Sequence, residues 1–250
     1  MARNGAIVSL SGGIDSTTLL GLLLHEEKEV LPVSFNYPSK HNKHELWAAR
    51  KIVEHYDLLD RWFVFDLTSV FRGFTSNLLN DQGEIPEGHY TDPSMKRTVV
   101  PGRNLIFLSI LSGLAESREI EEVVIGIHSG DHPIYPDCRP VFFESALQTV
   151  FHSSDGRVCL RAPFLWYDKA DILSDAIHLL DIPLHLTRTC YKDQPNPCGK
   201  CGSCVERAEA FRKVRIPDPC APPSLEFVDE DPLDPRCSPG YQDPENEEGV

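Results

Sequence analysis

The stretch LSGGIDSTTLL, residues 10–20, joins an apolar segment to an amphipathic one through two glycines. The preceding run AIVSL, residues 6–10, is short, apolar and bounded by turn residues, which is typical of a buried parallel strand. Beyond the glycines, leucines recur at helical spacing, and Asp15 and Ser16 stand where helix caps and first-turn acidic residues occur. The stretch therefore predicts a strand, a glycine turn and a helix.

The same alternation of strand-like and helix-like segments continues along the chain, without a visible internal repeat. The strand-like segments are residues 6–10, 30–37, 60–67, 122–128 and 157–164, and the helix-like ones are 15–27, 43–56, 104–120, 138–154, 168–182 and 205–214. Alternating elements predict an α/β fold with a parallel sheet, whose ligands bind at the carboxyl ends of the strands. Residues 68–99 are polar and rich in turn residues, which predicts a loop or a lid.

Composition narrows the class of protein. The 250 residues are enough for one large domain, or for one domain with an appendage. The net charge of −14 argues against a broad surface for nucleic-acid phosphates and favours a small substrate. Neither an apolar run of membrane-spanning length nor a signal-like leader is visible, so we expect a cytoplasmic protein without a membrane segment.

Much of the negative charge lies in the last segment, residues 217–250. It holds ten acidic residues, one basic residue and eight prolines, so it cannot form a packed core. We expect an extended or disordered tail. A solvated tail without a role and a docking strip for a protein partner both stay open.

The glycine turn has the composition of an anion site. Glycines let the backbone approach a ligand closely, and the N–H groups at a helix start attract negative charge. The hydroxyls of Ser11 and Ser16 add donors for phosphate oxygens, and Asp15 could hold a Mg²⁺ ion that bridges them. No lysine follows as in the Walker A motif, and the dinucleotide fingerprint is absent. An ordinary helix start is the alternative.

Four of the eight cysteines lie close together near the carboxyl end, in the pattern Cys190-x₇-Cys198-x₂-Cys201-x₂-Cys204. Four thiolates can surround a structural Zn²⁺ ion at about 2.3 Å each, and the glycines between them permit tight turns. An iron–sulfur cluster is the alternative, because similar spacings also hold iron. The other four cysteines show no such spacing.

The order Ser11-Gly12-Gly13-x-Asp15-Ser16 after a strand resembles the PP-loop of the ATP pyrophosphatase superfamily. The resemblance implies a Rossmann-like fold of the adenine-nucleotide alpha-hydrolase kind and a loop that cradles the pyrophosphate leaving ATP. The implied ATP-binding residues are Leu10, Ser11, Gly12, Gly13, Ile14, Asp15, Ser16, Thr17, Phe35 and Gly102.

Four motifs together, LSGGIDSTT, VPGRNLIFLS, YPDCRPVF and TCYKDQPNPCGKCGSCVERAEAF, resemble the QueC family of 7-cyano-7-deazaguanine synthases over residues 5–215. The resemblance implies an ATP-dependent ligase, often a homodimer, that makes the nitrile from 7-carboxy-7-deazaguanine and ammonia, with zinc on the four cysteines. It suggests a PP-loop domain at 1–185, a zinc subdomain at 186–216 and the tail at 217–250.

The family motifs also carry candidate site residues. The implied catalytic residues are Asp15, Ser16, Arg103, Asp137, Arg139 and Lys169, and the implied substrate-binding residues are Tyr37, Tyr135, Asp137 and Arg139. The cations would neutralise phosphate or carboxylate charge, although each could instead form a surface ion pair or cap a helix. Cys138 is a conceivable nucleophile, but activation by ATP makes covalent catalysis unnecessary.

Two loops depart from the usual family sequence, YPSKHNKHE at residues 37–45 and HSGDHPI at 128–134. These departures concern the acceptor of the activated group more than its adenylation. Three other functions stay open. They are transfer of the activated deazaguanine to an amine on a protein or nucleic acid, a PP-loop tRNA sulfurtransferase, and a nonenzymatic zinc-bearing binding module.

Overall fold

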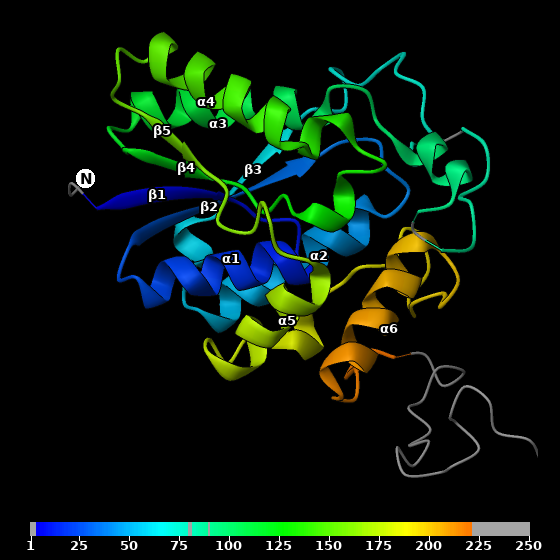
Figure 1. Ribbon diagram of the computed structural model, residues 1–250. Coiled ribbons are helices and arrows are strands. Elements are labelled where there is room, and N and C mark those ends of the chain that lie inside the picture. Colours follow the sequence, from blue (N-terminus) through cyan, green and yellow to red (C-terminus); the bar gives the residue numbers. More distant parts are fainter. Residues whose placement is uncertain (1–3, 80–81, 90, 222–250) are drawn as a thin grey trace, which may run out of the picture.

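The computed structural model describes residues 4–79, 82–89 and 91–221, which form a parallel sheet between two layers of helices (Figure 1). The strands are β1 (Gly5–Ser9), β2 (Glu29–Asn36), β3 (Phe63–Asp66), β4 (Glu122–Val124) and β5 (Cys159–Arg161). The helices are α1 (Ile14–His25), α2 (Asn42–His55), α3 (Arg103–Ser117), α4 (Pro140–Ser153), α5 (Lys169–His178) and α6 (Gly202–Val214). The predicted α/β class is confirmed.

The five strands lie in the order β3-β2-β1-β4-β5, and every neighbouring pair is parallel. Helices α1, α2 and α5 cover one face, and α3 and α4 cover the other (Figure 1). Strand β1 is central, so its side chains enter both cores: Ile7 packs into the core under α3 and α4, whereas Ala6 and Val8 pack into the opposite one. This explains why β1 reads as a continuous apolar run.

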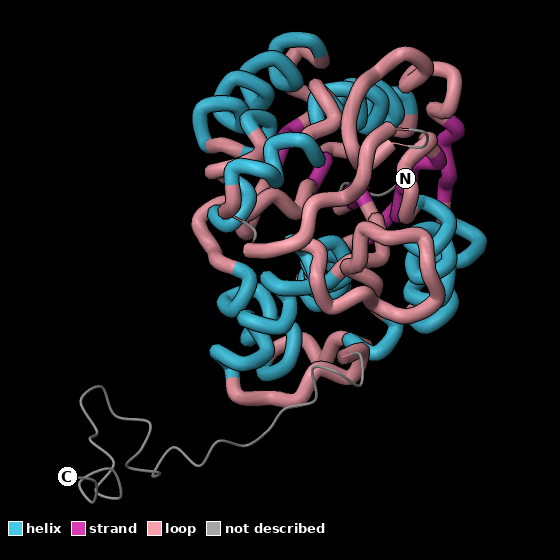
Figure 2. The backbone as a smooth tube through the Cα atoms, turned by 90° about the vertical axis from the view of Figure 1, so that its right-hand side faces the viewer, coloured by secondary structure: helices cyan, strands magenta, loops and turns pink. Residues whose placement is uncertain are grey.

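The order of the strands creates a crevice at the carboxyl ends of β1 and β4. The chain leaves β1 toward β2 on one side and later returns to β4 on the other side, with the connecting helices on opposite faces. Ligands of open α/β sheets bind at such a reversal. Figure 2 looks at these strand ends, and loops rather than helices cross in front of them.

Three strands are shorter than the sequence predicts. Strand β4 ends at Val124 although apolar residues continue to Ile127, and the predicted segments 60–67 and 157–164 pair only over β3 and β5. Pairing of β4 stops because β5 offers only three residues, and Ile125 makes one last backbone bond to Arg161 at 3.0 Å. The residues after β4 leave the sheet and are free to line the crevice.

Two helices also start two or more residues away from the predicted position. Helix α4 begins at Pro140 rather than at residue 138, because proline fits the first helical turn, where its missing N–H leaves no bond unmade. Helix α6 begins at Gly202 rather than at residue 205, so it starts between the last two cysteines of the cluster.

The predicted loop at residues 68–99 contains turns and the short 3₁₀ helix Pro93–Thr98. Lys40 anchors it beside β2, because its ammonium donates to the carbonyls of Asn77 at 3.0 Å and Gln82 at 2.6 Å. A role as a lid stays a prediction.

The suggested zinc subdomain is packed against the main sheet domain. Ala210 and Phe211 of α6 are buried in the core that α1 and α5 share. The boundary between residues 185 and 186 therefore stays a prediction. The extended or disordered state of the tail also stays a prediction, since its residues 222–250 lie outside the described residues.

Among the helices of the described chain, none has the length and apolar character that crossing a membrane requires.

Replacement of Ile7 by alanine tests the central role of β1. Ile7 is fully buried, so Ile7→Ala is expected to lower the free energy of unfolding by about 3 kcal/mol through lost burial and a residual cavity. The matched control is Val64→Ala on β3, which is 44% exposed and is expected to cost about 1 kcal/mol or less. Urea unfolding measures both, and equal losses would contradict this view of the core.

Candidate active site

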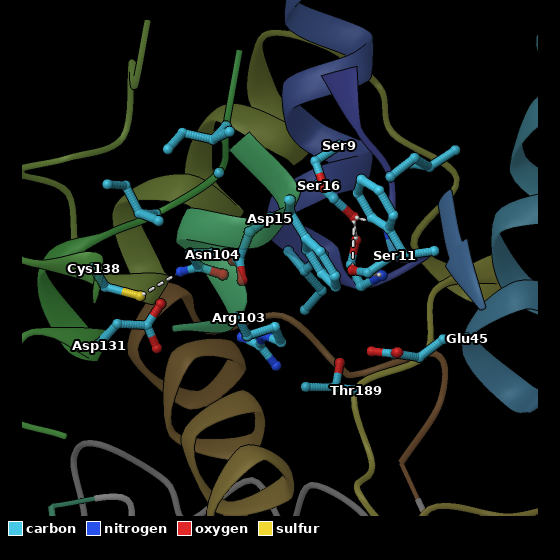
Figure 3. A pocket seen from close by; sticks show the side chains of 18 of the residues that line it. Ser9, Ser11, Asp15, Ser16, Glu45, Arg103, Asn104, Asp131, Cys138 and Thr189 are labelled. Carbon is cyan, nitrogen blue, oxygen red and sulfur yellow. Dashed lines mark hydrogen bonds between the residues drawn. The ribbon is translucent and has the colours of Figure 1, made fainter. Parts of the chain in front are cut away.

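A cavity opens at the crevice where β1, β2 and β4 end (Figure 3). Its walls come from the glycine turn and the first turn of α1, the first turns of α2 and α3, the segment after β4, and the segment that leads into α6. Segments far apart in the sequence thus meet at one place, as expected for the carboxyl edge of a parallel sheet.

The glycine turn is held tightly against α2. Gly12 has a φ of +83°, and a Cβ atom there would lie 2.7 Å from the Ala49 nitrogen and 2.9 Å from the Glu45 oxygen. Both the left-handed backbone and the contact with α2 exclude a larger residue. Gly12 itself lies outside the cavity lining, so its role is to shape the turn.

The start of α1 is open toward the cavity. Gly13 is its N-cap and provides no side-chain bond, so the first N–H groups of the helix are available to an anion. The hydroxyls of Ser11 and Ser16 lie 3.1 Å apart beside them (Figure 3), and Thr17 is turned inward to bond the Gly13 carbonyl at 2.7 Å. The turn therefore has the donors of a phosphate site.

A buried ion pair lies under this turn. The Lys169 ammonium, at the start of α5, donates to Asp15 Oδ2 at 2.6 Å and lies 3.5 Å from Glu206. Burial by itself would raise the pKa of Asp15, but Lys169 and His128 outweigh it and lower that pKa. Burial would likewise lower the pKa of Lys169, but Asp15 and Glu206 raise it overall.

Both members of the pair therefore stay charged through neutral pH. A carboxylate with a lowered pKa contributes stability that is lost only as the pH falls below its ordinary value of 3.8. An ammonium with a raised pKa loses its contribution only as the pH rises beyond 10.5. The charge that Lys169 presents to the cavity is constant over the range in which enzymes work.

One oxygen of Asp15 has no partner within the described residues. Asp15 Oδ1 is buried and makes no hydrogen bond there, while Oδ2 is held by Lys169. An unpaired carboxylate oxygen beside a phosphate site fits Mg²⁺, which binds through one or two carboxylates together with phosphate oxygens.

His128, Asp131 and Glu206 complete this end of the cavity. None of them is among the predicted site residues, although the first two belong to the loop at residues 128–134 that the sequence sets apart. His128 is 1% exposed, and its Nε2 lies 3.7 Å from Asp15 and 3.6 Å from Asp131. The Gly130 N–H donates to His128 Nδ1 at 3.1 Å, so Nε2 carries the proton toward the carboxylates. Glu206 comes from α6, and its only sequence signal is that it follows Cys204 by two residues.

The opposite wall is formed by the first turn of α3. Arg103 and Asn104 follow Gly102, whose φ of +66° turns the chain into the helix. Burial by itself would lower the pKa of Arg103, but Tyr37 and Tyr135 are the leading groups that raise it well above its usual range. Figure 3 shows Arg103 and Asp15 both directed into the cavity. Because Arg103 stays protonated, the wall formed by α3 carries a permanent positive charge.

Aromatic rings form the floor between the two walls. Phe35 of β2 stacks on Phe107 of α3, with ring centroids 3.9 Å apart and planes 12° apart. Tyr37 and Tyr135 line the same cavity, and the Tyr135 hydroxyl lies 3.3 Å from that of Tyr191. A flat heteroaromatic ligand fits such a surface.

Cys138 is kept as a neutral thiol. It is 2% exposed, and burial raises its pKa well above the usual range. The Asn104 amide donates to its sulfur at 3.2 Å (Figure 3). Since the thiolate is the nucleophilic form, this environment disfavours covalent catalysis by Cys138.

Two of the predicted catalytic and substrate-binding residues lie outside the cavity lining. The Asp137 carboxylate accepts a hydrogen bond from the Asn104 backbone N–H at 3.0 Å and so caps α3. Arg139 is exposed, and its Nε donates to the His132 carbonyl at 2.8 Å. Direct contact of either side chain with a substrate stays a prediction.

The remaining predicted residues lie at or beside the cavity. Its lining includes Leu10, Ser11, Gly13, Ile14, Asp15, Ser16, Phe35, Tyr37, Arg103, Tyr135 and Lys169, whereas Gly12, Thr17 and Gly102 shape the backbone around it.

The four cysteines converge as their spacing predicts. Their sulfur atoms all lie within 4.8 Å of one another, and those of Cys198 and Cys204 are 3.9 Å apart. Four thiolates at about 2.3 Å from one tetrahedral ion would lie roughly 3.8 Å apart, so the set fits a single Zn²⁺ ion. In an iron–sulfur cluster the thiolates bind different irons and lie further apart.

Backbone donors support thiolates in this set. The N–H groups of Lys192 and Cys198 donate to Cys190 Sγ, and those of Lys200 and Cys201 donate to Cys198 Sγ, at 3.3 to 3.4 Å. The neighbouring Cys201 thiol first, and then the N–H groups of Lys200 and Cys201, lower the pKa of Cys198 to about 6. Metal-binding cysteines need this deprotonated form.

Known proteins are similar to this chain over most of its length. The family described as "Queuosine biosynthesis protein QueC" matches residues 5–215. The chain is 44% identical to 7-cyano-7-deazaguanine synthase of Hahella chejuensis over 218 residues, which cover 87% of this chain and 93% of that protein. It is 42% identical to the enzyme of the same name from Caldicellulosiruptor saccharolyticus, over 86% of this chain and 93% of that protein.

Gly12→Ala is expected to lower the free energy of unfolding by roughly 3 kcal/mol, because alanine is strained at a positive φ and collides with the α2 backbone. Gly113→Ala in α3 is the matched control. A Cβ there meets no atom within 4 Å, so this change is expected to be neutral or to stabilise by up to about 1 kcal/mol. Urea unfolding decides, and a neutral Gly12→Ala variant would contradict the contact.

Elemental analysis of the purified protein is expected to give one zinc and no iron per chain. Cys198→Ser is expected to lose the zinc and to lower the melting temperature by about 10 °C, because metal binding contributes directly to folding. Cys159→Ser, at an exposed cysteine outside the cluster, is expected to retain the zinc and the wild-type melting temperature. Iron in the wild-type protein, or full zinc content in Cys198→Ser, would contradict the assignment.

Proposed function

The chain belongs to the QueC family, and on this premise we propose that it is an ATP-dependent carbon–nitrogen ligase, a 7-cyano-7-deazaguanine synthase. It converts 7-carboxy-7-deazaguanine and ammonia to the 7-cyano product and releases AMP and pyrophosphate. The observation that carries the proposal is the open N-terminus of α1 with the charged Lys169 beneath it, facing Arg103 across an aromatic floor.

The first step activates the carboxylate. A carboxylate oxygen attacks the α-phosphorus of ATP, the bond to the β-phosphate oxygen breaks, and pyrophosphate leaves with the electron pair. The first N–H groups of α1 and the hydroxyls of Ser11 and Ser16 are placed to bind the departing phosphates. Lys169 adds a fixed positive charge where negative charge accumulates.

Two further steps form the nitrile. Ammonia attacks the acyl carbon, AMP departs, and the nitrogen loses a proton, which gives the amide. The amide oxygen then attacks the α-phosphorus of a second ATP and pyrophosphate leaves. Loss of AMP and of both amide N–H protons then gives the carbon–nitrogen triple bond. Both activations are adenylations, so one pyrophosphate site serves both.

The opposite wall suits the substrate. Arg103 can pair with the substrate carboxylate or with the adenylate phosphate, and its raised pKa keeps it charged at either task. Tyr37, Tyr135 and the stacked pair Phe35 and Phe107 offer flat surfaces for the deazaguanine ring. Cys138, held as a neutral thiol, takes no covalent part.

Two metal ions belong to the proposal. Asp15 Oδ1 would hold Mg²⁺, which neutralises phosphate charge during transfer. Cys190, Cys198, Cys201 and Cys204 would hold Zn²⁺, which stabilises the fold of this segment.

A homodimer, a protein partner for the acidic tail and a cytoplasmic location stay predictions from the sequence. The absence of a direct nucleic-acid role likewise stays a prediction, based on the net charge of −14.

The proposal is tested by incubating the protein with 7-carboxy-7-deazaguanine, ATP and ammonium and analysing the products by mass spectrometry. The 7-cyano product, AMP and pyrophosphate are expected. Lys169→Met is expected to lower turnover by about 100-fold or more, since it removes the cation at the pyrophosphate site. Lys213→Met, which replaces a 63% exposed lysine that pairs with Asp168, is expected to retain activity.

Thermal unfolding of the Lys169→Met variant checks that it is folded, because it leaves Asp15 without its partner. AMP release without any nitrile, or an amide that accumulates as the final product, would contradict the proposed reaction. Equal activity of the two lysine variants would contradict the role of Lys169.

A further inference from the structure

The segment from the end of α5 through the first turn of α6 carries the cysteines and also forms one wall of the cavity. Arg188, Thr189, Tyr191 and Ser203 of this segment line the cavity, although each lies within two residues of a metal ligand. We propose that Arg188 is a positioning residue that couples metal binding at the four cysteines to nucleotide binding at the glycine turn.

One end of the connection is the backbone of Arg188. Its N–H donates to the Gly12 carbonyl at 2.8 Å, which joins the cysteine segment to the turn. Its own carbonyl oxygen lies 3.5 Å from the position that a Cβ on Gly13 would take. A shift of Arg188 would therefore move the turn whose N–H groups face the cavity.

The other end is the guanidinium group. Its Nη1 donates to the Pro195 carbonyl at 2.7 Å, and its Nη2 donates to the carbonyls of Lys192 at 3.0 Å and Gln194 at 2.6 Å. All three acceptors belong to the seven residues between Cys190 and Cys198. Arg188 thus gathers the irregular loop that connects two metal ligands.

Arginine is suited to this task because its rigid fork offers donors in several directions at once. The three carbonyls lie in a stretch without helix or strand, where side chains must supply the missing bonds. Its Nε is buried and has no hydrogen-bond partner in the described part of the chain, which leaves one donor available beside the glycine turn. The three carbonyls are neutral, so they do not cancel the positive charge of the guanidinium.

The position of this loop depends on the metal. Cys190 and Cys198 stand at its two ends, and a shared ion would fix the distance between them. The Cys198 N–H also donates to Cys190 Sγ at 3.3 Å, a bond that a thiolate strengthens. When the metal holds the loop, the three carbonyls are in place for Arg188, and Arg188 in turn holds the Gly12 carbonyl.

Such a connection makes the two sites thermodynamically linked. If metal raises the affinity for ATP by some factor, ATP raises the affinity for metal by the same factor. The inference rests on the proposed function only in naming ATP as the ligand of the glycine turn.

The test measures the dissociation constant of ATP, without the carboxylate substrate, on zinc-loaded and zinc-free protein. In the wild type, zinc removal is expected to weaken ATP binding by about tenfold. In Arg188→Met, ATP binding to the zinc-loaded protein is expected to be weak already, and zinc removal should change it by less than about twofold. The same change in both proteins would overturn the inference.

Lys192→Met is the matched control. It lies on the same loop and loses the ammonium that bonds Glu87, while its carbonyl stays available to Arg188, so the tenfold effect of zinc is expected to persist. Arg188→Lys keeps the charge but not the fork, and it is expected to behave as Arg188→Met does. If Arg188→Lys shows the same tenfold effect of zinc removal on ATP binding as the wild type, the role of the three carbonyl bonds is overturned.

A reciprocal measurement covers the case in which zinc-free protein does not fold. Zinc affinity of the folded, zinc-loaded protein is measured by competition with a chelator, with and without ATP. ATP is expected to raise it about tenfold in the wild type and less than about twofold in Arg188→Met. Failure of wild-type, zinc-loaded protein to bind ATP at all would overturn the proposed function, whereas ATP binding without linkage would overturn this inference alone.

Discussion

The contact between Gly12 and the backbone of α2 is the constraint on which the site depends. Because no side chain stands at this position, the turn lies directly on Ala49 and Glu45, and α1 starts at the edge of the sheet with its N–H groups open. Asp15, Lys169 and the hydroxyls of Ser11 and Ser16 are arranged around that helix start. The chain must leave β1, which is paired in parallel on both sides, and enter α1 within a few residues. The left-handed φ of Gly12 makes this sharp turn possible.

Charge in the cavity is distributed for a ligand that carries negative charge at two places. The buried Lys169 is held by carboxylates on one side, and Arg103 stands on the other side, where Tyr37 and Tyr135 are its leading partners. A buried ion pair such as that of Asp15 and Lys169 adds little net stability, since desolvation offsets much of the attraction. Its value lies in a cation that keeps its charge and its position at every pH at which the reaction could run.

The cysteine segment serves both the fold and the site. Its residues close the cavity, α6 packs with α1 and α5, and Arg207 binds Thr187 and Thr189 from within the same segment while its guanidinium pairs with Asp218 at 2.7 and 2.8 Å. The first residues of the acidic segment are therefore fastened to the domain through Asp218. A metal held by the four cysteines would lie within a few hydrogen bonds of the glycine turn, which would give a structural metal a route to affect catalysis.

The strand, turn and helix at residues 6–25, the α/β class and the cluster of four cysteines could be predicted from the sequence, because helical periodicity, glycine turns and closely spaced cysteines act over short stretches of chain. The sequence also pointed to Lys169 and Arg103, but only through resemblance to a family. Tertiary structure alone decided that Lys169 reaches Asp15 across 154 positions, that Glu206 and His128 join them, and that Asp137 caps α3 rather than lining the cavity. These contacts follow from how α5 and α6 pack on α1 and how α3 meets the loop after β4, and such long-range packing leaves no local spacing to read.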